Sequence, residues 1–319
     1  MTKYPMLLDA PCKDYLWGGN RLREEYGKVS DKDKIAESWE LSCHKDGESV
    51  IANGEFAGKT LAQYINEQGK AVLGKNCEKF ENFPILIKLI DAKDNLSVQV
   101  HPNNEYALRV EGEYGKTEMW YIVDCDPGAE LIYGFKNEIS RDEFKERIAN
   151  NTLLEVTNNV PVHKGDVFFI EAGTLHAIGK GILIAEIQQN SNTTYRVYDY
   201  GRVGADGKPR QLHVEKAVEV TELAPPKYPT KAMGEPVQKG GFTQTLLSSC
   251  EYFNVSKLEI SSAAQLEATD NSFNSILVLD GEVKIGDLIL KKGNTCFIPA
   301  GYGKYTVEGK SEVILTDVL

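Results

Sequence analysis

Short apolar segments recur along the chain, separated by Gly, Asp, Asn or Pro, and this pattern predicts a protein built mainly of β-strands. The segments are rich in β-branched and aromatic residues, which favour strands. The clearest predicted strands are residues 85–91, 119–123, 167–170, 182–187, 275–279 and 313–315. Many short strands with frequent turns are typical of β-sandwiches and β-barrels.

Helical signals are fewer. Thr60 is placed to cap one helix, and Ser140, followed by Glu143, has the spacing of a capping box at the start of another. A third helix is expected over residues 214–220.

A linker and a repeat organise the chain. Residues 223–236 contain four prolines and little apolar periodicity, which indicates an extended linker. We therefore expect two domains, residues 1–225 and residues 226–319. Each contains one copy of a repeated segment, which reads KGDVFFIEAGTLH at residues 164–176 and KGNTCFIPAGYGK at residues 292–304.

The repeated segment resembles the second cupin motif, in which a turn, a strand and a second turn end at a metal-binding histidine. We therefore expect two cupin barrels (double-stranded β-helices or jelly rolls), with the few helices attached to the N-terminal one. The first copy ends in His176, whereas the second has Lys304 at that position. A protonated ammonium group is a poor metal ligand. The N-terminal barrel is expected to bind metal, and the C-terminal barrel is expected to be metal-free.

Three further polar residues are candidate partners of His176. In the segment SVQVHP, residues 97–102, strand alternation places Gln99 and His101 on one face. Glu118 begins an apolar predicted strand, where a buried carboxylate needs a compensating charge. The four side chains form a ligand set suited to one Zn²⁺ or another first-row divalent metal, with positions left for water or substrate. A lone histidine is more often a core or surface residue, but this combination favours a catalytic metal site, with Gln99 its weakest member.

Longer motifs make the chain similar to the type I mannose-6-phosphate isomerases (phosphomannose isomerases), particularly their short bacterial form with two cupin domains. The similar segments cover nearly the whole chain and read DYLWGG, ESWELS, FPILIKLIDAKDNLSVQVHP, GKTEMWYI, AGTLHAI and EIQQNSNTTYRVYDYGR. The resemblance implies a metal-dependent aldose–ketose isomerase that interconverts D-mannose 6-phosphate and D-fructose 6-phosphate. It also implies the same four metal ligands, an essential Arg196, and Lys116 and Glu186 as further catalytic residues.

The chemistry of such an isomerisation suggests roles for these residues. A base must take the C2 proton of the open-chain aldose, a cis-enediol must be stabilised, and the proton must return to C1. Lys116 is a candidate base, and the planar guanidinium of Arg196 suits the oxyanion or the phosphate. Lys88 and Ser97 are expected phosphate contacts. Many relatives read HKPE where this chain reads GKTE, so a ring-opening role for that histidine does not transfer to Gly115.

Composition and charge limit the classes of binding partner expected for this chain. The 319-residue chain carries 36 Lys and Arg against 47 Asp and Glu, a formal net charge of −11. This balance argues against a nucleic acid or an anionic membrane as partner. The family resemblance implies a small hexose phosphate as the partner. Six scattered cysteines and the lack of a signal-peptide core indicate a cytoplasmic protein with free thiols. A monomer and a homodimer are both compatible with the sequence.

Two other functions stay open at this point. One is a cupin isomerase or epimerase of another phosphosugar, because the motifs fix the reaction type better than the sugar. The other is a non-catalytic, sugar-phosphate-binding cupin. The presence of Lys116, Glu118 and Arg196 argues against this last function, because a degenerate sensor is expected to have lost some of them.

Overall fold

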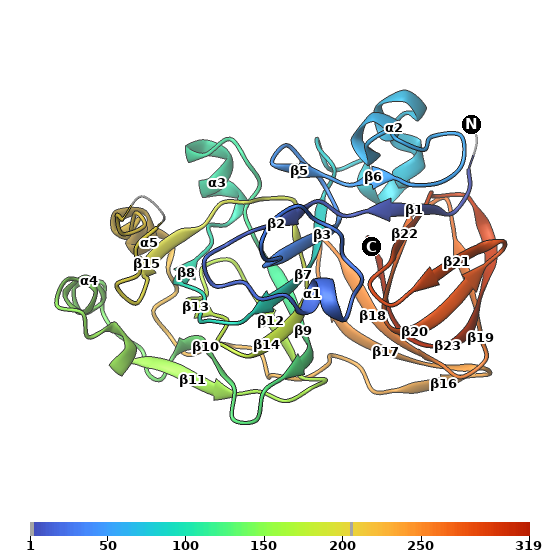
Figure 1. Cartoon of the computed structure of the whole chain (residues 1–319). Coiled ribbons are helices and arrows are strands. Elements are labelled where there is room, and N and C mark those ends of the chain that lie inside the picture. The colour runs from blue at the N-terminus through green and yellow to red at the C-terminus, as the bar shows by residue number, and fades with distance from the viewer. Residues whose placement is uncertain (1–2, 205–206) are drawn as a thin grey trace.

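The computed structural model describes residues 3–204 and 207–319 and has the mainly β architecture that the sequence predicts (Figure 1). Its strands form four sheets. All pairings between the named strands of the described ranges are antiparallel. None of the helices in these ranges is long and apolar enough to cross a membrane.

A six-stranded sheet forms the centre of the molecule. Its strands, in spatial order, are β12 (Val167–Ile170), β9 (Glu118–Cys125), β14 (Ile182–Gln189), β7 (Ile85–Ala92), β3 (Glu37–Leu41) and β2 (Cys12–Lys13). The central strands β7 and β14 are buried along their whole length, because both faces of the sheet are covered. Every second side chain of this sheet therefore points into the N-terminal half, towards a second sheet.

The second sheet has five strands and shares a core with the first. Its strands are β11 (Thr157–Pro161), β10 (Glu130–Phe135), β13 (His176–Ala177), β8 (Val98–Val100) and β15 (Tyr195–Tyr198). Trp120 and Phe168 from the six-stranded sheet pack with Leu131 and Tyr133 from the five-stranded one. The outer face of the five-stranded sheet is covered by α4 (Arg141–Ala149) and α5 (Val214–Val220), which lie at the left end of Figure 1.

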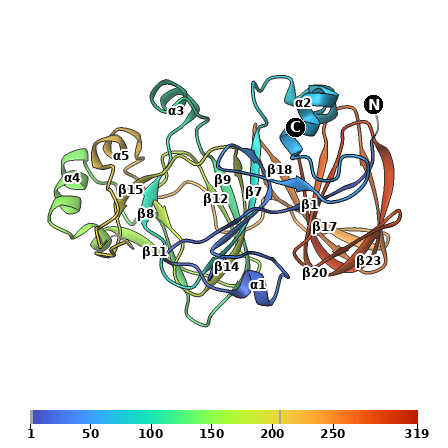
Figure 2. The same ribbon diagram turned by 45° about the horizontal axis from the view of Figure 1, so that its top comes forward.

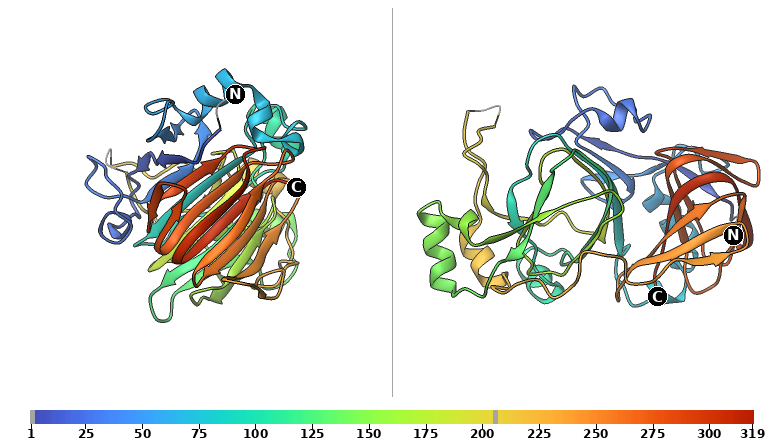
Figure 3. Two further views of the ribbon diagram at one scale, coloured as in Figure 1. Left: turned by 90° about the vertical axis from the view of Figure 1, so that its right-hand side faces the viewer. Right: turned by 90° about the horizontal axis from the view of Figure 1, so that it is seen from below.

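A ten-stranded sheet forms most of the C-terminal half (Figure 3). Its main path is β16 (Val237–Lys239), β17 (Phe242–Ser249), β18 (Asn254–Ile260), β23 (Gly303–Asp317), β20 (Asn274–Ile285), β22 (Thr295–Ile298), β1 (Met6–Asp9) and β6 (Val50–Ile51). Off this path, β19 (Ala263–Ala268) pairs with β23 and β21 (Leu288–Lys291) with β20. The blue strand β1 crosses over to the orange and red part of the molecule (Figure 2), where it pairs with β22, and β6 pairs with the other edge of β1. The two halves are thereby joined by main-chain hydrogen bonds.

The remaining elements are short. They are the hairpin of β4 (Cys43–His44) and β5 (Gly47–Glu48), the helices α1 (Arg21–Glu24), α2 (Leu61–Gln68) and α3 (Asn104–Val110), and the 3-10 helices η1 (Lys70–Leu73), η2 (Lys75–Cys77) and η3 (Leu153–Glu155). The predicted caps are confirmed, because Thr60 and Ser140 each accept a hydrogen bond from the backbone N–H three residues later. The predicted helix over residues 214–220 is α5.

All six predicted strands are present, and most extend beyond the predicted bounds. The stretch 221–236, described throughout, contains no helix or strand, in agreement with the predicted linker. One apolar core nevertheless connects the halves, since Ile87 and Met119 of the six-stranded sheet share a cluster with Phe273 and Phe297 of the ten-stranded sheet. The domain boundary at residues 225 and 226 stays a prediction.

Candidate active site

Strand alternation collects charged residues on the inner face of the six-stranded sheet. On β7, Ile87 and Leu89 belong to the core shared with the C-terminal half, so the intervening Lys88 points the other way. The same alternation places Glu118 of β9 and Glu186 of β14 on that inner face. Lys88 and Glu186 are direct partners in the sheet register.

The five-stranded sheet turns polar residues towards the same interior. Its outer face is apolar, and the residues between the apolar ones are Gln99 on β8, His176 on β13 and Arg196 on β15. Gln99 lies between the other two in the sheet register. The site is therefore built between two sheets whose other inward residues form a packed core.

His101, Glu118 and His176 form a buried group whose ligand atoms all lie within 4.8 Å of one another. The Nε2 atom of His101 is 3.7 Å from Glu118 Oε2, and that of His176 is 3.5 Å from Glu118 Oε1. Each Nδ1 lies near a backbone carbonyl, at 2.9 Å from Thr193 O for His101 and at 2.8 Å from Thr174 O for His176. With Nδ1–H donating to these carbonyls, both Nε2 lone pairs point into the group, where that of His101 also lies 3.0 Å from Lys116 Nζ.

The protonation of this group suits a cation. Burial and the neighbouring Lys116 lower the pKa of His176 to about 4 and that of His101 well below its usual value, so both rings are neutral at pH 7. Burial and the nearby Glu186 raise the pKa of Glu118 to about 7. Neither Glu118 oxygen has a well-formed hydrogen bond among the described residues, although Lys116 Nζ is 2.7 Å from Oε2. Two neutral imidazoles and an unsatisfied buried carboxylate fit a first-row divalent metal ion.

Gln99 lies at the edge of this group. Its Nε2 atom is 3.5 Å from His176 Nε2, and its Oε1 atom accepts a hydrogen bond from Ser97 Oγ at 3.3 Å. The side chain thus contacts one of the three clustered residues. Metal ligation by Gln99 stays a prediction.

A cavity of about 280 Å³ opens beside the group and brings together the other residues singled out in the sequence. Six of those residues line it, namely Lys88, Ser97, Gln99, Lys116, Glu186 and Arg196. They come from segments more than a hundred residues apart in the sequence. The cavity has room for a small polar molecule in contact with both sheets.

Lys88 is surrounded by carboxylates on one side of the cavity. Its Nζ atom is 3.2 Å from Glu186 and 3.5 Å from Glu37. Burial disfavours the ammonium form, but Glu37 and Glu186 outweigh it and raise the pKa of Lys88. Burial opposes ionisation of Glu186, yet Lys116 and Lys88 lower its pKa, and Trp120 Nε1 donates to it at 2.9 Å. Lys88 and Glu186 are therefore both charged at neutral pH.

Arginines gather at another part of the cavity. Arg196 Nε donates to Ser97 Oγ at 3.1 Å, and its Nη1 donates to the Gln211 carbonyl. Arg210, which also lines the cavity, forms a two-pronged pair with Asp199, whose carboxylate is shared with Arg202. The nearby Arg210 adds to burial in lowering the pKa of Arg196. The carboxylate of Asp199 thus pairs with two arginines, and Arg196 lies nearby as a third. This excess of arginines leaves the region positively charged.

Sequence reasoning missed Glu37 and Arg210 as cavity residues. Glu37 lies within the motif ESWELS, but its role depends on strand pairing that brings it to Lys88. Arg210 lies beyond the last quoted motif and reaches the cavity through Asp199, so no local pattern marks it. Gly115, in contrast, has a plain steric explanation. A Cβ atom there would lie 2.4 Å from the backbone of Asn103, so this backbone has no room for a side chain.

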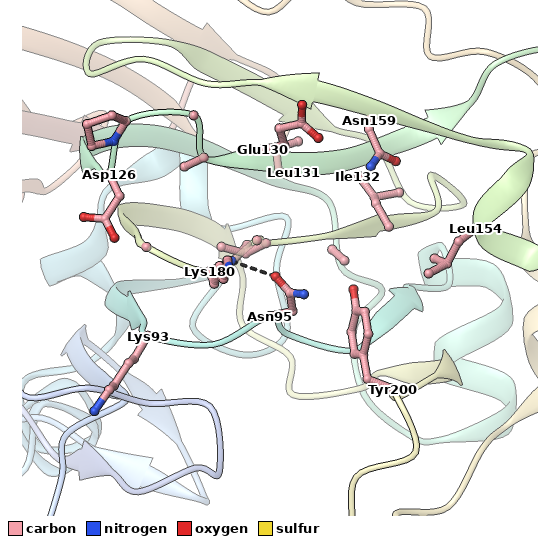
Figure 4. Close-up of a pocket in the computed structure, with 17 residues that line it drawn as sticks. Lys93, Asn95, Asp126, Glu130, Leu131, Ile132, Leu154, Asn159, Lys180 and Tyr200 are labelled. Carbon is pink, nitrogen blue, oxygen red and sulfur yellow. Dashed lines mark hydrogen bonds between the residues drawn. The ribbon is translucent and has the colours of Figure 1, made fainter.

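A larger cavity of about 570 Å³ lies elsewhere (Figure 4). Its four charged lining residues, Lys93, Asp126, Glu130 and Lys180, are all exposed. None of the predicted catalytic or metal-binding residues lines it. A wide solvent groove with hydrated charges offers no counterpart to the buried group above, so the smaller cavity is the candidate active site.

The fold and the site together define the class: a mainly β protein with a buried His–Glu–His group that opens on a cationic cavity. Residues 6–122 match the family model of the catalytic domain of type I phosphomannose isomerase, and residues 243–318 match that of the cupin domain of mannose-6-phosphate isomerase. The chain is 39% identical to mannose-6-phosphate isomerase ManA of Bacillus subtilis, over 99% of both chains. It is 38% identical to the mannose-6-phosphate isomerase of Streptococcus mutans, over 97% of both.

A solved structure agrees with these matches. The crystal structure of the mannose 6-phosphate isomerase from Bacillus subtilis superimposes with a TM-score of 0.90 at 36% identity and covers 99% of each chain. The chain belongs to the type I phosphomannose isomerase family. The family resemblance inferred from the sequence motifs is confirmed.

Proposed function

We propose that this protein is a metal-dependent aldose–ketose isomerase, a mannose-6-phosphate isomerase, that interconverts D-mannose 6-phosphate and D-fructose 6-phosphate through a cis-enediol. The observation that carries the proposal is the single cavity that joins Lys116, beside the His–Glu–His group, to the arginine-rich region. Near full-length similarity to proteins named mannose-6-phosphate isomerase supports this choice of substrate.

The same proposal includes the architecture. Residues 1–225 would form a catalytic cupin barrel with helical insertions, and residues 226–319 a metal-free cupin barrel. The repeated segment, the His–Glu–His group in the first half and the apolar interior of the second half support this division. We further propose a cytoplasmic monomer or homodimer.

His101, Glu118 and His176 hold the proposed metal, one Zn²⁺ per chain, with Gln99 as a fourth ligand. A divalent cation bound there would polarise the carbonyl and hydroxyl oxygens of the substrate. The chain's own residues do the rest of the chemistry. The Thr193 and Thr174 carbonyls fix the two histidine rings, so the ligand atoms are already oriented towards one point.

The arginine-rich region binds the substrate phosphate in this proposal. Arg196 and Arg210 supply planar donors that match phosphate oxygens, and Ser97 adds a hydroxyl. Lys88 contributes positive charge from a position where Glu37 and Glu186 hold it. A dianionic phosphate matches a region in which Asp199 pairs with Arg202 and Arg210 while Arg196 has no carboxylate partner of its own among the described hydrogen bonds.

With the phosphate anchored there, the sugar carbons extend towards Lys116. Acting as the base, Lys116 takes the proton from C2; the electron pair of the C–H bond forms the C1–C2 double bond, and the π pair of the C1 carbonyl moves onto O1. A proton passes from O2 to O1, the electron pair left on O2 forms the C2 carbonyl, and the C1–C2 π pair takes the proton back from Lys116 at C1. Glu186 lines the same cavity as an ionised carboxylate and is the second candidate for this proton transfer.

The test is the rate of fructose 6-phosphate formation from mannose 6-phosphate, measured before chelation, after chelation and after zinc is restored. Activity that disappears and returns supports the reaction and the metal together. A folded, zinc-loaded protein without activity would refute the assigned substrate. Release of deuterium from C2-labelled mannose 6-phosphate by Lys116→Ala and Glu186→Gln would then separate the two candidate bases.

A further inference from the structure

The loop between β14 and β15, residues 190–194, forms part of the active-site wall. Asn192 and Thr194 line the cavity. The carbonyl of Thr193 lies 2.9 Å from His101 Nδ1 and so fixes the orientation of that ring. Any shift of this loop therefore moves a cavity wall and one candidate metal ligand at the same time.

The loop has no regular secondary structure, and polar side chains hold it from outside the cavity. Glu113 Oε2 accepts hydrogen bonds from the Asn192 amide and the Thr193 hydroxyl, each at 3.4 Å. Asp46, in the β4–β5 hairpin, accepts a hydrogen bond from the Asn192 side-chain amide at 2.9 Å. Two carboxylates from distant segments thus hold the loop: Glu113 bonds both Asn192 and Thr193, and Asp46 bonds Asn192 alone.

Glu113 is itself held in place. Lys45 Nζ is 2.7 Å from its Oε1 atom, and the Nε2 atom of the buried His44 is 3.6 Å from its Oε2 atom. Burial opposes ionisation of Glu113, but Lys45, the Asn192 amide and His44 outweigh it and lower its pKa. An ionised acceptor is therefore present at neutral pH, opposite two groups of the loop that donate.

We propose that Glu113 is a positioning residue for the metal centre: it holds loop 190–194 so that the Thr193 carbonyl keeps His101 Nε2 directed at Glu118 and His176. Glu113 contacts neither the clustered ligand atoms nor the cavity. Glu113 acts on the metal centre indirectly: its two hydrogen bonds hold the loop, and the Thr193 carbonyl of the loop orients His101. The inference rests on the metal site of the proposed function and is independent of the sugar.

The experiment compares the zinc affinity of the full-length protein with that of Glu113→Ala and Glu113→Gln, by competition with a chromophoric chelator. Glu113→Ala removes both acceptor oxygens and is expected to weaken zinc binding about 10-fold or more. Glu113→Gln keeps one acceptor oxygen for the loop and is expected to stay within about 3-fold of the wild type. The matched control is Glu67→Ala, which removes a carboxylate that pairs with Lys59 instead of with the loop.

Thermal unfolding of the chelated proteins separates positioning from general stability. The chelated Glu113→Ala protein should unfold within a few degrees of the chelated control. The substitution removes mainly two long hydrogen bonds to the loop and an ion pair with the exposed Lys45. Thr193→Val supplies a second test, since it keeps the carbonyl that holds His101 and removes the hydroxyl bound by Glu113. This variant is expected to lose zinc affinity to a smaller extent than Glu113→Ala.

Three results would overturn the inference. The first is wild-type zinc affinity in Glu113→Ala while the wild type itself binds zinc, which leaves the proposed function intact. The second is an equal loss in Glu113→Ala and Glu113→Gln that follows a drop in unfolding temperature. A wild-type protein that binds no zinc would remove the metal site and this inference together.

Discussion

The two copies of the repeated segment form equivalent strands, but only the first ends in a residue that can bind a metal. Strand β12 of the first copy corresponds residue by residue to strand β22 of the second. Phe168 of β12 and Cys296 of β22 both point into the core of their own half. Their neighbours Phe169 and Phe297 both point into the shared core. The copies differ at the end, where His176 is buried and Lys304 is exposed.

The neighbouring strands explain this difference. Across the interior from His176, the inward positions of the six-stranded sheet, which contains β12 of the same segment, include Glu118 and Glu186. The interior of the C-terminal half is instead filled by an apolar cluster that includes Leu258, Ile276 and Val313. The repeated turn–strand–turn segment is therefore a scaffold that buries hydrophobic area. Metal chemistry requires polar residues on the strands beside it, where burial without a cation is costly.

The largest expected effect comes from removing the histidine of the first copy. His176→Ala should lose bound zinc, and activity should fall about 10³-fold or more, because several kcal/mol of transition-state stabilisation depend on the ion. Metal analysis of the purified protein and the isomerase assay measure both losses. Lys304→Ala is the matched control in the second copy and should change neither. Full activity in His176→Ala would contradict the assignment of the first copy as the metal-binding one.

Arg196→Ala should lower kcat/KM by about 10²- to 10³-fold, because a fixed donor to a charged oxygen is lost. Metal content should stay at the wild-type level, since Arg196 contacts Ser97 and Gln211 rather than the His–Glu–His group. Arg196→Lys keeps the charge without the planar donor pair and should recover part of the loss. Loss of zinc from Arg196→Ala would show that this residue supports the metal site instead of the substrate.

Much of the candidate metal site in the N-terminal half was predictable from the sequence. Strand alternation in SVQVHP and the turn before His176 brought Gln99, His101 and His176 to one interior, because local periodicity dictates side-chain direction. Burial of Glu118 followed from the apolar strand it begins. The linker and the helix caps were equally local signals, and they are present in the structure.

The remaining features depend on contacts that no local pattern encodes. Strands β1 and β6 pair into the C-terminal sheet, although their sequences resemble any short strand. Arg210 reaches the cavity only because Asp199 holds it, and Glu113 reaches the loop 190–194 from another segment. Periodicity shows which face a residue occupies, whereas tertiary packing determines which segment lies opposite that face.

A moderate effect on stability is expected from changing Glu40, which links the N-terminal half to Thr295 in the second copy of the repeated segment. Glu40 is fully buried, and it accepts hydrogen bonds from Lys28 at 2.7 Å and from Thr295 at 2.9 Å. Glu40→Gln removes the charge opposite Lys28 and should lower the free energy of unfolding by about 1–3 kcal/mol. Urea unfolding of the chelated protein measures this loss. Glu259→Gln, which changes an exposed carboxylate paired with the partly buried Lys257, should cost less than about 0.5 kcal/mol.

The smallest expected effect is the most direct test of the comparison. Lys304→His restores the cupin histidine to the second copy, yet metal analysis should still find one zinc per chain. Lys304 is exposed, and the cluster inside that half offers apolar side chains where the first half offers a carboxylate and a second histidine. One new imidazole without such partners binds zinc too weakly to retain it through purification. A second, tightly held zinc in Lys304→His would mean that the repeated segment carries the metal chemistry by itself.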